Sequence, residues 1–309
     1  EEAVKQKPEN AEIYGVLCDA YVELGQYDKA VTVVDKMVSL RPDLRSYSRV
    51  SYLREIYGDN NGAIEAMIMA VKAGMPGLEQ TAWTRVTLGK LYEKKGDLAN
   101  ADLQYNIALD QTKHYAFAVA GLARIQAYKK NYKEAITLYQ KSADIIPEFS
   151  FTEELANVYI LTGDKEKGKK EAESVIGMLK EDSDAGHAVD LELANLYAKL
   201  LNNNDKALEH AEIEYKKRPE NIDVNRCLAL IYYRKNEINK AAEYLKVANK
   251  TNRQDPELIC LTGLINYKAG DKKGGVELIN KSFKMNPYQD EEITQEAKQI
   301  VESPLTSLK

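Results

Sequence analysis

The sequence predicts an all-α solenoid made of repeated helical hairpins, and three observations along its 309 residues lead to this prediction. A small residue recurs in steps of 33, 38, 34, 33, 39, 34 and 34, at Ala30, Ala63, Ala101, Ala135, Gly168, Ala207, Ala241 and Gly275. A turn position precedes each small residue by about five residues, at Gly25, Gly58, Gly96, Lys130, Gly163, Asn202, Asn236 and Gly270. A proline often ends the second helix, at Pro42, Pro76, Pro147, Pro219 and Pro287. Self-similarity with a period near 34 residues indicates stacked helical repeats.

Each part of the repeat has a physical reason. In the first helix, Tyr14, Leu17 and Tyr21 lie three and four residues apart, so they share one helix face. Gly25 can adopt a positive φ and end that helix. Ala30 lies where the second helix crosses the first, and a larger side chain there would push the two helices apart. One hairpin cannot bury its own apolar face, so the hairpins are expected to stack.

The fullest form of the pattern lies in residues 82–115, with Lys113 in the place of a final proline and with Leu88, Gly89, Tyr92, Gly96, Ala101, Tyr105 and Ala108 at fixed offsets. This pattern resembles the tetratricopeptide repeat (TPR). The resemblance covers about nine-tenths of the chain in eight copies, at 11–43, 44–77, 82–115, 116–148, 149–180, 187–221, 222–255 and 256–289. Two of these copies are degenerate, because Gly168 and Gly275 replace alanine. The resemblance implies a right-handed superhelix of about eight TPR units.

The stretch "SYLREIYGDNNGAIEAM" is also similar to a block that recurs in bacterial TPR proteins of unassigned role. This second resemblance implies a bacterial source.

Two irregular steps interrupt the period. The step of 38 places extra residues in an expected loop at 73–81, around "AGMPGLEQT". The step of 39 follows an expected long helix at roughly 164–181 and the segment "EDSDAG". The second step marks a candidate boundary between an N-terminal block, 1–180, and a C-terminal block, 181–309. One continuous stack with a longer loop is the alternative.

Both ends of the chain carry helical segments outside the eight copies. The stretch "EEAVKQKP" has the spacing of the tail of an earlier second helix, which predicts that the chain begins inside a repeat. A frayed N-terminal helix is the alternative. After Pro287, "YQDEEITQEAKQIVES" is an amphipathic segment, and we expect it to form the helix that caps the last apolar face. The final "PLTSLK" is expected to be a loose tail.

Composition argues against several classes of protein. The net charge of −5 is too mild to suggest a nucleic-acid-binding protein. The sequence has no H-E-x-x-H, C-x-x-C, phosphate-loop or dinucleotide motif, so we expect no metal, no cofactor and no enzymatic activity. The three cysteines, Cys18, Cys227 and Cys260, are expected to be buried free thiols, because their number is odd and their spacing wide.

The resemblance implies that the first helix of each unit lines a concave groove that binds a peptide or a partner helix. Carrying the inward positions over to this sequence predicts a partner-binding surface of Arg45, Arg49, Tyr52, Trp83, Lys90, Phe117, Arg124, Tyr128 and Asn157. In the second to fourth copies, five basic residues at these positions, Lys94 included, face only Glu55 and Glu93. Arginine and large aromatic residues are enriched in binding hot spots. The prediction is therefore a groove for a protein or peptide segment of acidic character, and the alternative is a solvated helix face.

Three functional hypotheses follow. The first is a non-catalytic scaffold that binds a partner segment in the concave groove. The second is an architectural protein that self-associates through repeat faces, and the third is a regulatory region of an enzyme encoded upstream. The sequence does not identify the compartment: the cytoplasm is one alternative, and the periplasm or cell envelope is the other if a leader was removed upstream.

Overall fold

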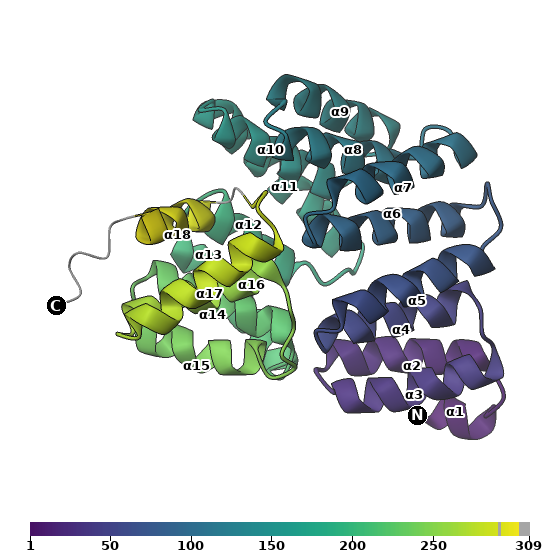
Figure 1. The fold of residues 1–309 in the computed structure, drawn as a ribbon. Helices are drawn as coiled ribbons and strands as arrows, with labels where there is room; N and C mark the ends of the chain where they lie inside the picture. The colour runs from purple at the N-terminus through teal and green to yellow at the C-terminus, as the bar shows by residue number, and fades with distance from the viewer. Residues whose placement is uncertain (290–291, 303–309) are drawn as a thin grey trace.

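A computed structural model describes residues 1–289 and 292–302, and these residues form helices and no strand (Figure 1). Sixteen of the helices pair into eight consecutive hairpins, as the repeat predicts. The hairpins are α2 (Ala11–Glu23) with α3 (Tyr27–Leu40), α4 (Leu44–Ile56) with α5 (Asn60–Ala73), α6 (Glu79–Lys94) with α7 (Leu98–Gln111), α8 (Ala116–Tyr128) with α9 (Tyr132–Ile145), α10 (Phe149–Leu161) with α11 (Lys165–Asp184), α12 (Asp190–Lys199) with α13 (Asn204–Lys217), α14 (Ile222–Arg234) with α15 (Ile238–Ala248), and α16 (Pro256–Lys268) with α17 (Lys272–Met285).

The turn inside each hairpin has the backbone conformation that the periodicity predicts. All eight turn positions have a positive φ, including the three that are not glycine, Lys130, Asn202 and Asn236. Asparagine tolerates this left-handed conformation better than most residues with a side chain. The turn geometry is therefore common to all the repeats, although the residue type varies.

The small positions are all buried where the two helices of a hairpin cross. The two glycines in the copies that read as degenerate have a structural reason. A Cβ on Gly168 would lie 2.6 Å from Ile160 Cγ1, and a Cβ on Gly275 would lie 2.6 Å from the Gly263 carbonyl oxygen. The fifth and eighth hairpins therefore cross so closely that even alanine would collide.

The remaining two helices lie at the ends of the stack. α1 (Glu2–Gln6) precedes the first hairpin and packs on α2, and α18 (Glu292–Glu302) packs on α16 and α17 at the other end. The expected capping helix is thus confirmed, whereas the expected tail "PLTSLK" lies outside the described residues.

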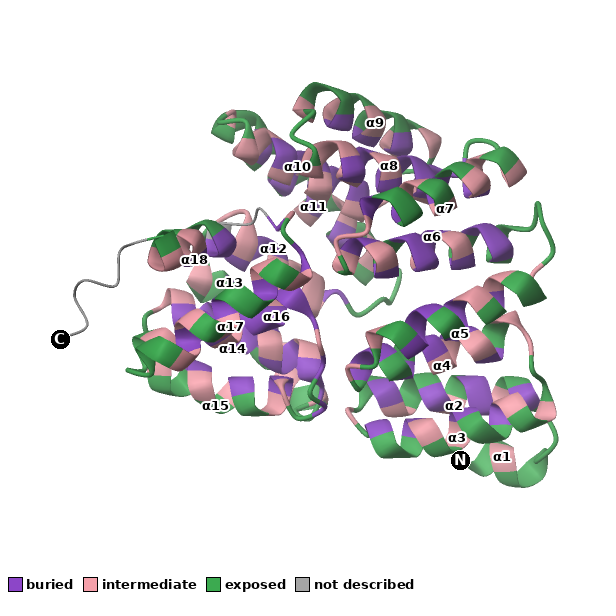
Figure 2. Ribbon diagram, viewed as in Figure 1, coloured by how far each residue is buried: buried purple, intermediate pink, exposed green. Residues whose placement is uncertain are grey.

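The long helix predicted at 164–181 is α11, and α6 begins at Glu79, inside the loop predicted at 73–81. Figure 2 shows buried residues recurring along the helix faces that meet between hairpins.

The first three and the last three hairpins of the superhelix lie side by side and contact each other along a seam (Figure 1). Hydrogen bonds join the turns of the first three hairpins to the loops that follow α13, α15 and α17. The amide of Asn221 donates to the Glu23 carbonyl at 3.0 Å, and that of Asn60 donates to the Gln254 carbonyl at 2.8 Å. The amide of Asn286 donates to the Glu93 carbonyl at 3.2 Å. The chain therefore closes on itself along this seam, and the closed arrangement, in which hairpins one to three contact hairpins six to eight, is here called the ring. The division into blocks 1–180 and 181–309 stays a prediction.

The aromatic core position of the third hairpin depends on two glycines of neighbouring helices. The ring of Tyr105 lies between the backbones of α6 and α8, and a Cβ on Gly89 or Gly121 would come within 2.4 Å or 2.6 Å of it. Tyr105 is fully buried, so its ring has no alternative position in the packed interior.

We expect Gly121→Ala to lower the free energy of unfolding by about 1–3 kcal/mol, because the added methyl group overpacks the core against Tyr105. Urea denaturation followed by circular dichroism measures this change. Gly177→Ala on α11 is the matched control, since a Cβ there meets no atom within 4 Å. The control should gain about 0.5–1 kcal/mol from helix propensity. Equal effects of the two substitutions would contradict the packing argument.

Candidate functional site

The structure distributes the nine predicted groove residues over three cavities and one core contact. Four of them share one cavity, three line a second, one lines a third, and one packs in the core. The closure of the ring causes this division, because the C-terminal repeats lie over the middle of the concave face.

The first cavity, here called the α4–α6 pocket, has a volume of about 630 Å³ and contains Arg45, Arg49, Tyr52 and Trp83. Arg45, Arg49 and Tyr52 follow one another at helical spacing on α4, and Trp83 comes from α6, the first helix of the third hairpin. Tyr52 is 41% exposed and Trp83 is 45% exposed, although large apolar residues elsewhere in the stack are mostly buried. The rest of the lining is Asp19, Leu44, Ser48, Ser51, Glu55, Met67, Glu79, Gln80, Thr87 and Leu91.

The two arginines of the α4–α6 pocket are held by carboxylates of the preceding hairpin. Arg49 makes a two-pronged contact with Asp19, at 2.8 Å from Nε and 2.6 Å from Nη2. Arg45 Nη1 donates to Glu12 at 2.7 Å. The Asp19 and Glu12 side chains are both more than half exposed. The pocket thus combines an apolar aromatic wall with an arginine rim.

Arg124 belongs to a buried polar network instead of an open groove. Its side chain is 15% exposed, and Nε donates to Glu93 at 2.9 Å. The Tyr105 hydroxyl also donates to Glu93. Although burial opposes the charged form, the Glu93 carboxylate raises the pKa of Arg124 well above its usual value. Arg124 therefore holds α8 to α6.

Lys90, Arg124 and Tyr128 line the second cavity, of about 230 Å³, which residues of the C-terminal repeats close from the other side. These closing residues include Asp255, Pro256 and Glu257 at the start of α16, together with Asn286 and Gln289 after α17. Tyr128 lies 6.2 Å from Tyr288, measured between ring centroids.

The remaining two predicted residues lie apart from these cavities. Asn157 lines a cavity of about 770 Å³, to which α10, α11, α12, α14, α16 and α18 contribute. Phe117 packs edge to face on Phe151 at 5.2 Å and lies 5.7 Å from Tyr115. Phe117 thus joins the cores of the third, fourth and fifth hairpins.

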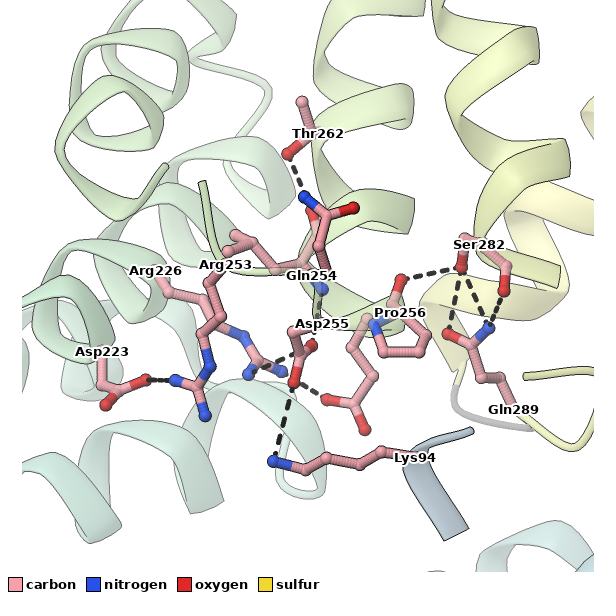
Figure 3. Close-up of polar contacts among 12 residues, drawn as sticks. Lys94, Asp223, Arg226, Arg253, Gln254, Asp255, Pro256, Thr262, Ser282 and Gln289 are labelled. Carbon is pink, nitrogen blue, oxygen red and sulfur yellow. Dashed lines mark hydrogen bonds and ion pairs between the residues drawn. The ribbon is translucent and has the colours of Figure 1, made fainter. Parts of the chain in front are cut away.

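A row of alternating charges, here called the charged clasp, crosses the seam of the ring, and Figure 3 shows all its members except Glu55. It consists of Asp223, Arg253, Glu55, Lys94, Asp255 and Arg226. Arg253 contacts both Glu55 and Asp223 at 3.0 Å, and Lys94 pairs with Glu55 and lies 3.9 Å from Asp255. Sequence reasoning placed Glu55 and Lys94 on the concave face but missed their partners, because 198 residues separate Glu55 from Arg253.

Burial and charge act in opposite directions on the acids of the clasp. Burial favours the neutral forms, but Lys94 and Arg253 hold the pKa of Glu55 below its usual value. Arg226 and Lys94 likewise hold the pKa of Asp255 well below its usual range. Both acids are therefore charged at neutral pH.

The three cysteines lie in the interior of the stack. Cys18, Cys227 and Cys260 are free and buried, and burial raises the pKa of Cys18 and of Cys227 to about 12. Within residues 1–289 and 292–302, no three His, Cys, Asp or Glu side chains gather in a way that could hold a metal ion. In the same part of the chain, every helix is too short or too polar to cross a membrane.

We expect Arg124→Ala to lower the free energy of unfolding by about 3–5 kcal/mol, because it leaves the Glu93 carboxylate buried without its arginine. Arg45→Ala removes an exposed pair and should cost less than about 1 kcal/mol. Urea denaturation compares the two variants. Similar losses in both would contradict the assignment of Arg124 to the buried network.

The depressed pKa values of the clasp acids predict a pH dependence. Since the unfolded chain binds protons more readily at these groups, their contribution to stability is present above the unfolded pKa of about 4 and is lost as pH falls through the lower folded values. The difference in urea midpoint between the wild type and Glu55→Gln should be largest near pH 7 and shrink below about pH 4. A difference in urea midpoint that grows as the pH falls would contradict the predicted direction of the pH dependence.

Comparisons with known proteins were made for sequence and structure. Two family models, each described as tetratricopeptide repeat, match residues 1–55 and 86–148. A solved tetratricopeptide repeat protein from Parabacteroides merdae ATCC 43184 aligns with a TM-score of 0.49 and 16% identity, over 84% of this chain and 98% of that one. The solved APC/C hetero-tetramer Cut9-Hcn1 aligns with a TM-score of 0.45 and 14% identity, over 86% of this chain and 44% of that one. No curated protein matches the chain.

TPR proteins generally mediate protein–protein interactions and are typically non-catalytic scaffolds. The two family matches fall on the first and on the third and fourth hairpins, where the sequence pattern is fullest, and all eight hairpins share the same turn geometry. The chain therefore carries tetratricopeptide repeats in residues 1–55 and 86–148.

Proposed function

We propose that the chain is a non-catalytic scaffold that binds a short segment of a partner protein in the α4–α6 pocket. The observation that supports this proposal is the pair of exposed aromatic side chains, Tyr52 and Trp83, in a concave pocket of about 630 Å³ with Arg45 and Arg49 at its rim. Exposed aromatic residues beside arginine are typical of binding hot spots.

The pocket favours a particular kind of segment. Its wall includes the apolar side chains Leu44, Met67 and Leu91, which suit an apolar or aromatic anchor residue. Arg49 presents its guanidinium to a carboxylate already, in the form of Asp19. A partner carboxylate in the place of Asp19 would accept the same two hydrogen bonds. We therefore propose a ligand with an apolar anchor and a neighbouring acidic group or C-terminal carboxylate.

Acidic side chains of the pocket limit how much negative charge a bound ligand can carry. Asp19, Glu55 and Glu79 also line it and outnumber the two arginines. Long acidic runs would meet these carboxylates, whereas a single well-placed carboxylate need not. The apolar anchor is thus proposed to supply most of the affinity.

Trp83→Ala is expected to weaken partner binding at least tenfold, since it removes the largest exposed aromatic surface of the pocket. The wild type and the variant would be compared first by affinity capture from the native cell with mass spectrometry, and then by isothermal titration of the captured partner. Leu103→Ala is the matched control, because Leu103 is an equally exposed apolar residue on α7, outside the α4–α6 pocket.

Capture of the same partner with equal affinity by the wild type and Trp83→Ala would contradict the pocket assignment. Thermal unfolding of each variant checks that the fold is intact. Loss of binding in Leu103→Ala as well would place the partner on the outer surface instead.

A further inference from the structure

Two side chains of α4 belong both to the α4–α6 pocket and to the seam of the ring. The seam joins hairpins one to three, here called the N-terminal arm, to hairpins six to eight, here called the C-terminal arm. Tyr52 lines the pocket and also a cavity of about 570 Å³, to which α12, α13 and α14 of the C-terminal arm contribute. Glu55 follows Tyr52 by one turn of α4, lines the pocket and contacts Arg253 across the seam. The C-terminal arm therefore acts on side chains that line the pocket.

Arg253 is held within the C-terminal arm and reaches Glu55 across the seam. It lies between α15 and α16, its side chain is 9% exposed, and Nη1 donates to Asp223 of α14 at 3.0 Å (Figure 3). Nη2 donates to Glu55 at 3.0 Å. The other cation on Glu55 is Lys94, which belongs to α6 of the N-terminal arm. Ring closure therefore gives Glu55 a second positive partner.

The charge of Glu55 matters because acidic side chains outnumber basic ones in the lining of the pocket. The charged lining residues are Asp19, Glu55, Glu79, Arg45 and Arg49. The Glu55 side chain is 12% exposed, so its charge is screened by water and salt less than that of a surface carboxylate. Any ligand carboxylate at the arginine rim therefore experiences the charge that Glu55 retains.

Asp223 does not cancel the effect of Arg253 on Glu55, because it binds the other terminal nitrogen of the guanidinium. Burial raises the pKa of Glu55, but Lys94 and Arg253 together keep it below its usual value. The potential at Glu55 is thus positive in the closed ring. Without Arg253, Glu55 would keep one cation instead of two, and more of its negative charge would repel a ligand carboxylate. A neutral ligand would escape this repulsion.

We propose that the C-terminal arm regulates the α4–α6 pocket through Arg253, a positioning residue that neutralises Glu55 when the ring is closed and so admits a partner carboxylate to the arginine rim. This inference rests on the proposed function of the pocket and adds that the closed ring is the form that accepts an acidic ligand. By thermodynamic linkage, a ligand that prefers the closed ring stabilises closure by the same factor.

The chain contains a single tryptophan, Trp83, so its indole N–H gives one nuclear magnetic resonance signal that reports on the pocket. N-acetyl-phenylalanine supplies an aromatic anchor with a carboxylate, and N-acetyl-phenylalaninamide supplies the same anchor without the charge. Titrating each compound into the full chain at low ionic strength gives two dissociation constants. Their ratio measures how well the pocket accepts a carboxylate.

Arg253→Met removes the charge and keeps a long side chain. It should weaken carboxylate binding about fivefold and leave amide binding unchanged. Arg253→Lys should keep most of the carboxylate affinity, and adding Glu55→Gln to Arg253→Met should restore it. Arg226→Met is the matched control, because Arg226 belongs to the same clasp but pairs with Asp255 and Glu257 inside the C-terminal arm. The control should bind both compounds as the wild type does.

A second variant opens the seam without changing the clasp. A Cβ on Gly25 would lie 2.2 Å from the Glu220 carbonyl oxygen, and a Cβ on Gly58 would lie 2.5 Å from the Asn252 carbonyl oxygen. Gly25→Asn/Gly58→Asn therefore forces the two arms apart, which a larger radius of gyration in small-angle X-ray scattering would show. This wedge variant should lose carboxylate binding as selectively as Arg253→Met.

The wedge variant has a matched control in Gly163→Asn/Gly270→Asn, where a Cβ meets no atom within 4 Å. Asparagine already occupies the equivalent turn position with positive φ at Asn202 and Asn236, so both double variants should keep their hairpins. Circular dichroism checks that they do. The control should keep the radius of gyration and the binding ratio of the wild type.

Quenching of Trp83 fluorescence measures the charge of the pocket without a ligand. Iodide is an anion and acrylamide is neutral, so Arg253→Met should lower the ratio of iodide to acrylamide quenching, whereas Arg226→Met should not. If neither phenylalanine compound shifts the wild-type Trp83 signal, the proposed function is contradicted, and the quenching ratio still tests the role of Arg253.

Three results would overturn the regulatory proposal. Equal loss of carboxylate and amide binding in Arg253→Met would show a structural effect instead of an effect of charge. Full carboxylate binding in a wedge variant that scattering shows to be open would separate the pocket from the seam. An unchanged quenching ratio in Arg253→Met would show that Arg253 does not set the charge of the pocket.

Discussion

The whole architecture depends on one constraint. Hairpins one to three and hairpins six to eight must rise by the same distance along the superhelix axis. Three turns of the N-terminal arm meet three loops of the C-terminal arm at an offset that stays between 193 and 198 residues. Such a register is possible only if each hairpin on one side rises as far as its counterpart on the other. The four extra residues of the 38-residue step lie in the segment between α5 and α6 and in the lengthened start of α6.

Different forces hold the stack and the seam. Within the stack, neighbouring hairpins bury apolar side chains such as Met67, Leu196 and Ile231, and the hydrophobic effect dominates. At the seam, asparagine amides satisfy backbone carbonyls and the charged clasp aligns alternating charges. Buried ion pairs contribute little net stability against apolar packing, but a mismatched arrangement is costly. The seam also contains an apolar contact, because Ile222 at the start of α14 is buried in the core of the first two hairpins and its backbone N–H donates to the Tyr27 hydroxyl.

Contacts between distant repeats change which side chains of the concave face are open to a partner. In an open solenoid, Arg45, Arg49, Lys90 and Arg124 would form one basic stripe. In the closed ring, Arg124 is paired with Glu93 and Arg49 is paired with Asp19, whereas Lys90 is exposed beside the start of α16. The proposed binding site therefore depends on the exposed aromatic pair of the α4–α6 pocket more than on net charge.

The spacing of residues along the chain was enough to predict the repeat, the eight hairpins, the turn positions and the capping helix. These features depend on local spacing: a helix places residues three and four apart on one face, and a small residue must lie at each helix crossing. Only the tertiary structure decided that Tyr105 lies between Gly89 and Gly121, that Arg253 reaches Glu55, and that the groove is divided. These contacts depend on the small rotation between successive hairpins, which accumulates over the stack and which no short stretch of sequence encodes. The bacterial source and the compartment stay predictions, since neither depends on the fold.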